Sequence, residues 1–327
     1  MSTATTTRHH KNALNEQRPR ARLIARVLLG AETPAQIHEA LAAYLFLSPW
    51  LLGLLLFFGG PIIVSLGLSF YDYSLGSAPA YIGLSNFRMA FSGDRLFWPS
   101  LGRTFYWSII FVPTVVTGSL LLSMLLNQKL LATRFFRTLF FLPHLTPTVS
   151  LVVLWSYILH PRLGPINYVL ARLGLGQPGW LSSPTWAMPA LIIMSLWGGM
   201  GGNRMLIFLA GLQGVPQELY EAAEIDGAGS WARFRNVTLP MISPMVFFNV
   251  VLGIIGALQV FTTAFVATEG GPAYATWFLA LHIYNQAFRY FRMGYGSTLA
   301  WILACLLILF TYVQMKISDR WVHYATS

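Results

Sequence analysis

Residues 213–244 read QGVPQELYEAAEIDGAGSWARFRNVTLPMISP and form the one long polar insertion between two strongly apolar segments. Pro216 predicts a helix start, because proline suits the first helical position, and the acids that follow complement the positive end of the helix dipole. Gly227 is expected to end this helix in a left-handed conformation. Ser230 is expected to cap a second short helix that begins at Trp231.

Two short helices that meet at a glycine would make a compact surface with fixed acids. Ala222 and Ala223 are small enough to let another surface approach closely. This pattern favours docking of another protein over catalysis. The alternative is an amphipathic helix lying on the lipid surface, but that class is usually rich in Lys and Arg, and Glu218, Glu221 and Glu224 argue against it.

The composition is typical of an integral membrane protein. The 327 residues could form two soluble domains, but 55% are hydrophobic, only 10% are charged, and the mean hydropathy is +0.58. The formal charge of +10 could indicate nucleic acid binding, yet the cations are spread over loops between apolar runs and form no dense patch. We therefore expect contact with membrane lipid and no nucleic acid partner. Cys305 is the one cysteine, so an intramolecular disulfide is excluded.

Six uncharged apolar runs follow a basic N-terminal tail at residues 1–36. A membrane span needs about 20 residues. The runs cover roughly residues 41–70, 104–127, 138–159, 186–203, 241–268 and 294–315. We therefore predict an all-α polytopic membrane protein, with six transmembrane helices in a permease-like domain over residues 37–327. A cleaved signal peptide is not expected, because the first run starts late and is too long.

The positions of Lys and Arg predict the orientation, since these residues gather on the cytoplasmic side of a membrane. With the tail inside, fourteen lie in inner segments: Arg8, Lys11, Arg18, Arg20, Arg22, Arg26, Lys129, Arg134, Arg137, Arg204, Arg233, Arg235, Lys316 and Arg320. Seven lie in outer segments: Arg88, Arg95, Arg103, Arg162, Arg172, Arg289 and Arg292. Both termini are therefore expected in the cytoplasm, and so is the polar insertion.

The polar insertion also carries a family resemblance. Its residues Glu221-Ala222-Ala223, Gly227 and Val237-x-Leu239-Pro240 resemble, at their present spacing, the EAA motif of the membrane subunits of binding-protein-dependent ABC importers. The fuller form Glu221-Ala222-Ala223-x-x-Asp226-Gly227-Ala228 is similar to the carbohydrate branch, of the maltose and glycerol-3-phosphate permease type. The resemblance covers about residues 45–320 and includes Gly83-Leu84-x-Asn86-Phe87, Phe136-Arg137-Thr138-Leu139-Phe140-Phe141-Leu142-Pro143 and Gly270-Gly271-Pro272.

This resemblance implies a role for each part of the chain. Residues at about 213–240 would form a cytoplasmic coupling loop, whose ATPase-coupling residues would be Glu221, Ala222, Ala223, Asp226, Gly227, Ala228, Leu239 and Pro240. The implied partners are two cytoplasmic ATPase subunits, a second permease subunit and an extracytoplasmic solute-binding protein. ATP-driven closure of the ATPases would draw the coupling loops together and turn the cavity from inward-facing to outward-facing. The implied location is the bacterial inner membrane.

What the sequence lacks points the same way. The six apolar runs contain no Asp or Glu, whereas an ion- or proton-coupled carrier usually needs an intramembrane acid or another ion site. No lysine follows a glycine, so the chain has no phosphate-binding Gly-Lys-Ser/Thr, and partner subunits would use the ATP. We predict a transport subunit that is not an enzyme and has no cofactor of its own. The alternatives are an ion- or proton-coupled secondary transporter and a membrane-embedded enzyme.

No catalytic or metal-binding constellation is evident, and the scattered His144, His160 and His282 are predicted to be packing or interfacial residues. The fifth run offers a candidate substrate pathway. The polar residues Asn249, Gln259 and Thr263 are expected to share one helix face, at about 100° per residue, with Gly253 and Gly256. The amides would suit the hydroxyls of a sugar or sugar-like polyol. The alternative is a small-residue packing stripe whose amides bond a neighbouring helix.

Overall fold

The computed structural model describes residues 34–128 and 132–322, so most of the predicted basic tail lies outside the described residues. The described chain is mainly helical. Its one sheet within these ranges is an antiparallel hairpin of β1 (Tyr71–Asp72) and β2 (Ala80–Tyr81). The chain divides into two compact units between Ser65 and Leu66.

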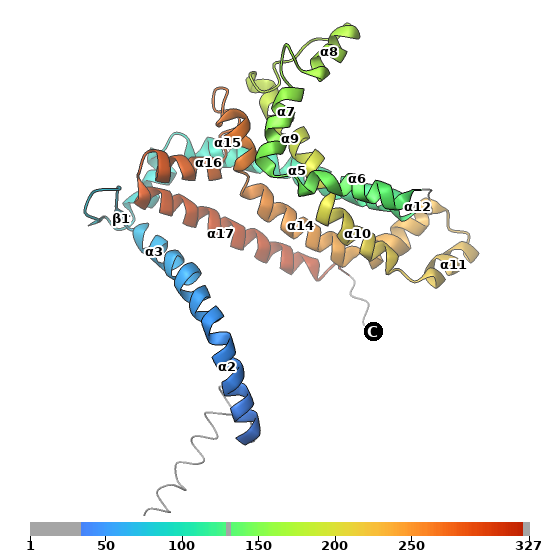
Figure 1. Ribbon diagram of the computed structural model, residues 1–327, viewed down its shortest axis with the longest axis horizontal. Helices are drawn as coiled ribbons and strands as arrows, with labels where there is room; N and C mark the ends of the chain where they lie inside the picture. Colours follow the sequence, from blue (N-terminus) through green and yellow to red (C-terminus); the bar gives the residue numbers. More distant parts are fainter. Residues whose placement is uncertain (1–33, 129–131, 323–327) are drawn as a thin grey trace, which may run out of the picture. The chain divides into compact units, whose positions relative to one another are not determined.

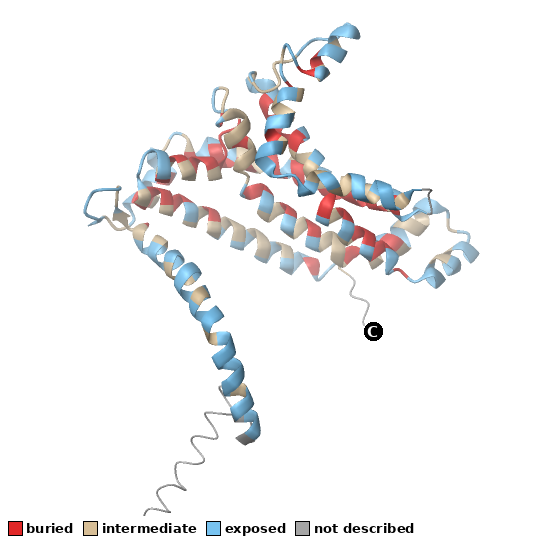
Figure 2. Ribbon diagram, in the orientation of Figure 1, coloured by how far each residue is buried: buried red, intermediate tan, exposed pale blue. Residues whose placement is uncertain are grey.

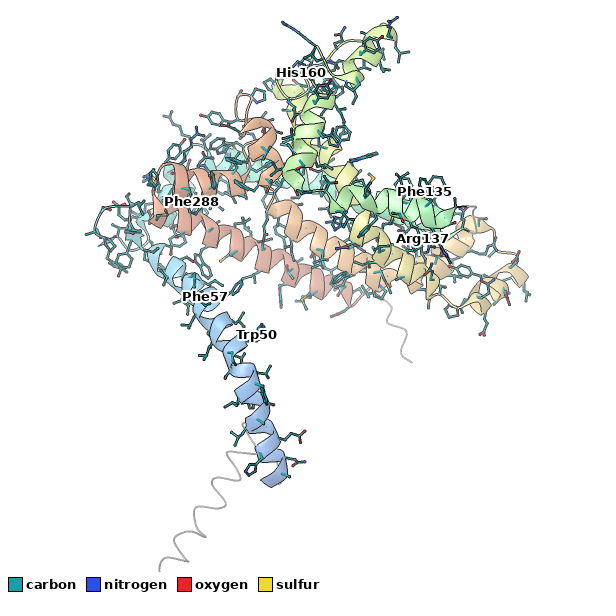
Figure 3. The ribbon with its side chains drawn as sticks, in the orientation of Figure 1. Trp50, Phe57, Phe135, Arg137, His160 and Phe288 are labelled. Carbon is teal, nitrogen blue, oxygen red and sulfur yellow. The ribbon has the colours of Figure 1, made fainter. Side chains whose placement is uncertain are left out.

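The first unit holds a long apolar helix, built from α2 (Pro34–Leu54), the π-helical turn η1 (Leu55–Gly59) and the start of α3 (Gly60–Leu68). The wide turn precedes Pro61, which has no N–H to continue the helical ladder. Trp50 and Phe57 are 64% and 78% exposed and project from the ribbon (Figure 3). Residues His38–Leu68 are long and apolar enough to cross a membrane, and their exposed apolar side chains suit contact with lipid.

The second unit is built around α5 (Phe97–Asn127) (Figure 1). Its buried residues recur every three or four positions, as a helix packed on several sides requires. The helices that pack most extensively against it are α9 (Pro184–Met200), α10 (Gly202–Gln213) and α14 (Ser243–Leu258). Buried residues also occupy the first part of α17 (Met293–Ser318), up to Leu303, and α17 packs on α14 (Figure 2).

Hydroxyl groups join α5 to its neighbours. The Ser123 hydroxyl donates to the carbonyl of Met205 on α10, at 2.8 Å. The Thr104 hydroxyl accepts from the backbone N–H of Leu279 at 3.0 Å, where α16 (Leu279–Tyr284) begins. Such polar contacts matter in lipid, because burial of apolar surface gives little net attraction between helices there.

Three pairs of consecutive helices are bent at the break between them. α6 (Thr133–Leu145) meets α7 (Thr148–Ile158) at 99°, α9 meets α10 at 47°, and residues Ser230–Met241 meet α14 at 69°. By length and composition, three described helices could cross a membrane unaided, namely His38–Leu68, α5 and α17, and the number is up to six if each bent pair is one span. The predicted all-α polytopic fold is confirmed, with breaks at Pro147 and at Gly201 that the run lengths did not reveal.

The fifth expected span is shorter than predicted. α14 ends at Leu258, and a separate helix, α15 (Thr262–Thr268), follows. The segments that we predicted to lie outside contain further short elements: α4 (Ser85–Arg88), the π-helical turns η2 (Met89–Gly93) and η4 (Asn285–Arg289), and α8 (Pro165–Arg172). Within the second unit, α15 and α16 lie at the opposite end from the coupling loop (Figure 1).

Candidate functional site

The coupling loop folds into two short helices, α11 (Gln217–Ile225) and α12 (Ser230–Arg233). The π-helical turn η3 (Phe234–Thr238) and α13 (Leu239–Met241) lead back into α14. Pro216 stands just before the first helical residue rather than at it, with Glu218 in the first turn. This placement differs by one residue from the prediction and leaves the expected dipole interaction in place.

Gly227 ends α11 as predicted. Its φ is +77°, in the left-handed region that favours glycine. The Gly227 N–H donates to the carbonyl of Glu224 at 3.0 Å, and the Ala228 N–H donates to that of Ala223 at 2.9 Å. These two bonds form the Schellman C-cap, which satisfies carbonyls that the helix end would leave unpaired. Asp226 lies at the C-cap position, and its N–H donates to Ala222 at 3.0 Å.

The second short helix begins differently from the prediction. Ser230 is the first residue of α12, Gly229 occupies the N-cap position, and no side chain caps this helix. The two helices are instead connected by side chains. Arg233 lies 3.5 Å from the Glu224 carboxylate, and the Tyr220 and Thr238 hydroxyls are 3.0 Å apart.

The coupling loop presents a mixed apolar and acidic surface. Ile225 is 88% and Trp231 71% exposed, and Glu221 and Ala222 are also exposed. Ala223 and Ala228 are half-buried, so only one of the two adjacent alanines that we expected at a contact surface is fully available. An exposed patch of this kind fits a protein contact.

The opposite side of the coupling loop is anchored to the membrane part. Tyr220, Phe234 and Val237 pack against the hydrophobic cluster that contains Phe208 and Leu212 of α10. Leu239 is exposed and Pro240 is half-buried, and the Pro240 carbonyl accepts from the Ser243 hydroxyl at 2.7 Å. The coupling loop is therefore placed to move together with α10 and α14.

The three predicted pathway residues do not share one helix face. Asn249 is fully buried, and its amide nitrogen donates to the Met245 carbonyl at 3.0 Å, while its Oδ1 has no hydrogen-bond partner among the described residues. A side chain added at Gly253 would contact Val112 of α5 at 3.1 Å, which is the packing arrangement given above as the alternative. Gln259 lies exposed beyond the end of α14, and Thr263 belongs to α15.

Thr263 does line a cavity of about 230 Å³. The other polar residues around this cavity are His144, Thr146, Thr148 and Ser195, which come from the α6–α7 bend and from α9. The structure thus brings Thr263 together with hydroxyl groups of two other segments, a set that no single stretch of sequence indicates.

The end of α6 and the break between α9 and α10 meet beside this cavity. A Cβ on Gly202 would collide with the His144 ring, and a Cβ on Gly201 would collide with the Phe140 carbonyl. Gly202 also has a φ of +67°. Glycine at these positions therefore lets the break between α9 and α10 pack directly against the end of α6. Non-helical backbone inside a membrane protein commonly lines a cavity, as it does here at Thr146 of the α6–α7 bend.

Four residues in segments that we predicted to lie outside form a largely buried hydrogen-bonded group, which we call the outer network: Asp94, Trp277, His282 and Tyr295. One oxygen of Asp94 lies 2.7 Å from His282 Nε2 and accepts from the Tyr295 hydroxyl at 2.6 Å. Trp277 Nε1 donates to His282 Nδ1 at 3.2 Å, so Nε2 carries the proton and donates to Asp94. His282 is a packing residue, as predicted.

The outer network favours the ionised form of Asp94. Partial burial raises the pKa of Asp94, but hydrogen bonds from His282, Tyr295 and the Leu96 backbone outweigh it and hold that pKa well below the ordinary value. His282 and Tyr295 follow Asp94 by 188 and 201 positions in the chain, so no local sequence pattern could have identified the outer network. Within residues 34–128 and 132–322, no group of three or more His, Cys, Asp or Glu side chains could hold a metal ion.

Comparison with known proteins identifies the family. Residues 103–324 match the family model of the binding-protein-dependent transport system inner membrane component. The chain is 40% identical to a probable ABC transporter permease protein, YesP, of Bacillus subtilis over 290 residues, covering 88% of this chain and 93% of that protein. It is 35% identical to the lactose transport system permease protein LacF of Rhizobium radiobacter, covering 83% and 92%.

A solved structure shares the fold. A chain of a bacterial alginate ABC transporter, crystallised in complex with an alginate pentasaccharide-bound periplasmic protein, superposes with a TM-score of 0.78 at 23% identity, covering 88% of this chain and 96% of that one. The secondary transporter alternative is therefore not favoured, and the prediction that the chain is not an enzyme is confirmed by the family. The chain belongs to the binding-protein-dependent transport system inner membrane components, the permease subunits of ABC importers.

Proposed function

We propose that this chain forms half of the translocation pathway of an ATP-driven importer for a saccharide. Sequence relatives support a saccharide: the arabinooligosaccharides permease AraP of Bacillus subtilis is 32% identical, and the trehalose/maltose permease MalF of Thermococcus litoralis is also 32% identical. The observation that carries the proposal is the exposed coupling loop, a rigid corner whose other side is packed on α10.

The coupling loop is proposed to dock on one of two cytoplasmic ATPase subunits. Ile225 and Trp231 supply apolar area, while Glu221 supplies a charge for an Arg or Lys of the ATPase. A second permease subunit completes the pathway, and an extracytoplasmic binding protein delivers the solute to the outer loops. The ATPases hydrolyse ATP, and this chain needs no cofactor of its own.

The proposed orientation in the bacterial inner membrane has both termini in the cytoplasm. It follows from the excess of Lys and Arg in inner segments. Thiol labelling tests it in a Cys305→Ser background. Gly176→Cys, on an outer loop where the added side chain meets open space, is expected to react with an impermeant reagent in intact cells, and Gly214→Cys is not. Labelling of the second variant would reverse the orientation.

Within the membrane, the cavity at the α6–α7 bend is the proposed part of the substrate pathway. Thr263, Thr148 and Ser195 offer hydroxyl donors and acceptors to a saccharide. Gln259, exposed at the end of α14, extends this polar route, whereas Asn249 is the innermost and most buried of the predicted pathway residues.

Reconstitution tests the proposed function. The chain, its companion permease, the ATPases and the binding protein are placed in vesicles, and uptake of radiolabelled saccharides is measured with and without ATP. We expect uptake only with ATP and the binding protein. Uptake by this chain alone, driven by an ion gradient, would refute the proposal in favour of a secondary carrier.

A further inference from the structure

Arg103 differs from the other partly covered arginines of the second unit. Arg103, Arg137 and Arg204 each have a side-chain nitrogen that protein covers and that meets no acceptor. Arg137 nevertheless donates to the Leu126 carbonyl at 3.1 Å, and Arg204 to that of Gly199 at 3.5 Å. Arg103 makes no hydrogen bond and no ion pair with any residue of the described ranges.

One covered nitrogen of this partly exposed guanidinium group therefore lacks an acceptor. Arginine stays charged in proteins, so it cannot lower the cost of burial by losing its proton. Charged groups in spanning helices are usually paired, and they commonly mark a pathway for substrate or ions. Arg103 lies in the second turn of α5, at the outer end of that helix, where an arriving solute would pass.

The side chain of Arg103 borders a shallow, widely open cavity of about 520 Å³. Tyr106 lies one turn further along α5, Pro184 and Thr185 are the first two residues of α9, and Ala275 also lines the cavity. No acidic residue lines the cavity.

Two features of the cavity favour a negative ligand. The guanidinium carries a full positive charge, and the start of the 17-residue helix α9 adds a partial positive charge at Thr185. Tyr106, which is exposed, adds a hydroxyl group that can donate to an oxygen atom. A neutral sugar would leave the charge of Arg103 unpaired, whereas an oxyanion would form a charge-assisted hydrogen bond.

We propose that the Arg103 cavity binds an oxyanion group, a carboxylate, sulfonate or phosphate, carried by the incoming saccharide. The importer would then take an acidic sugar and would hold its charged group at the outer entrance before translocation. This assignment of substrate class rests on the proposed function. An anionic lipid headgroup has the same chemistry, and the test separates the two sources.

The test measures anion binding by the purified importer complex in neutral-lipid nanodiscs. Galacturonate, inorganic sulfate and galactose are titrated calorimetrically against the wild type, Arg103→Gln and the control Arg162→Gln, which alters an exposed arginine of another outer loop. We expect galacturonate and sulfate to bind and galactose not to bind at this site. Arg103→Gln should weaken binding of both anions at least about tenfold, and Arg162→Gln should not.

A second variant covers the case in which Arg103→Gln does not assemble. Ala275→Glu places a carboxylate at the edge of the cavity without removing Arg103, and it should also abolish galacturonate binding. To test an anionic lipid headgroup as the occupant of the cavity, native mass spectrometry compares the amount of phosphatidylglycerol retained by the wild type and by Arg103→Gln. Loss of this lipid without any binding of galacturonate would overturn the saccharide assignment, and equal anion binding by all variants would overturn the site.

The outcome is distinguishable from failure of the proposed function. Anion binding is measured on the complex without transport, so it is scored even if no saccharide is taken up. ATP-dependent uptake of only neutral sugars, with no galacturonate binding, would retain the importer and reject the acidic substrate.

Discussion

The coupling loop and the outer network are built in opposite ways. In the coupling loop, the bonds that form the corner at Gly227 join residues only three and five positions apart, and its contact surface is exposed. In the outer network, Asp94 bonds residues 188 and 201 positions away, and His282 is fully buried. The first region gains its shape from local sequence and keeps side chains such as Ile225 and Trp231 exposed. The second holds distant segments of one chain together.

This difference predicts separate effects of mutation. Changes in the coupling loop should impair energy transfer and leave the folded subunit intact, since few buried contacts depend on its exposed residues. Changes in the outer network should lower stability, because each removes a hydrogen bond between segments that only tertiary structure brings together.

The largest effect is expected for Gly227→Val. The φ of +77° is unfavourable for a β-branched residue, at a cost of about 1–3 kcal/mol, although the added side chain would meet open space. We expect uptake to fall about 100-fold with the membrane level of the subunit unchanged, measured by vesicle transport and immunoblot. The matched control is Gly229→Val, where φ is −67° and space is also open, and it should transport normally. Equal activity of the two variants would show that the corner is not required.

Glu221→Lys should have the next largest effect. The charge is exposed on α11 and would meet the ATPase surface with the wrong sign, so we expect uptake and stimulated ATP hydrolysis to fall about 30-fold. Pull-down of the ATPase with the permease measures the contact directly. The same change one turn earlier, Glu218→Lys, serves as the control, and a larger loss there would move the contact surface away from Glu221.

Asp94→Asn tests the outer network. It replaces an ionised acceptor of the His282 and Tyr295 hydrogen bonds, so the free energy of unfolding should fall by about 1–3 kcal/mol, seen as a lower thermal midpoint of the purified complex. Tyr295→Phe removes one of the same bonds and should lower the midpoint less. An unchanged midpoint in both variants would mean that the network contributes no stability.

The difference in stability between the wild type and Asp94→Asn should depend on pH in a direction that the pKa of Asp94 sets. The pKa of Asp94 is lower in the folded protein than its ordinary value of about 3.9, so its contribution to stability is present above that value and is lost as the pH falls below it. The gap in thermal midpoint between the wild type and Asp94→Asn should therefore be constant from pH 8 to pH 5 and shrink below about pH 4. A gap that grows on acidification would contradict an ionised Asp94.

The smallest effect is expected within the membrane, where two amides are compared. Gln259→Ala should change uptake or substrate preference about two- to fivefold without altering complex yield, because the side chain is exposed. Asn249→Ala should instead lower thermal stability and leave transport per assembled complex unchanged, since the side chain is buried and bonded to Met245. Unaltered transport and preference in the double variant would remove both residues from the pathway.

Much of the molecule could be read from its residues. The apolar runs predicted the all-α membrane fold, because a hydrocarbon core demands long uncharged segments. The order of acids, Gly227 and the following residues predicted the corner of the coupling loop, since the left-handed position selects glycine. The Ser230 cap was wrong by one position, because Gly229 already supplies the extended backbone that starts α12.

The periodicity of the sequence could not predict where helices break or how they bend. A continuous fifth helix would have placed Asn249, Gln259 and Thr263 on one face, but the chain breaks after Leu258 and carries Thr263 to a cavity formed with α6, α7 and α9. The bend angles of the broken spans also depend on what packs against them, as Gly201 and Gly202 show by admitting the end of α6.

The sequence by itself determined that the chain is a membrane protein, how many apolar segments it has, and that the coupling loop turns at Gly227. Each of these depends on interactions within a few residues. Only the tertiary structure decided which polar groups meet. It joined Asp94 to His282 and Tyr295, and it left Arg103 beside a cavity without a partner. The physical reason is that a partly buried charge is paired or unpaired according to segments far away in the chain, and helix packing alone brings those segments together.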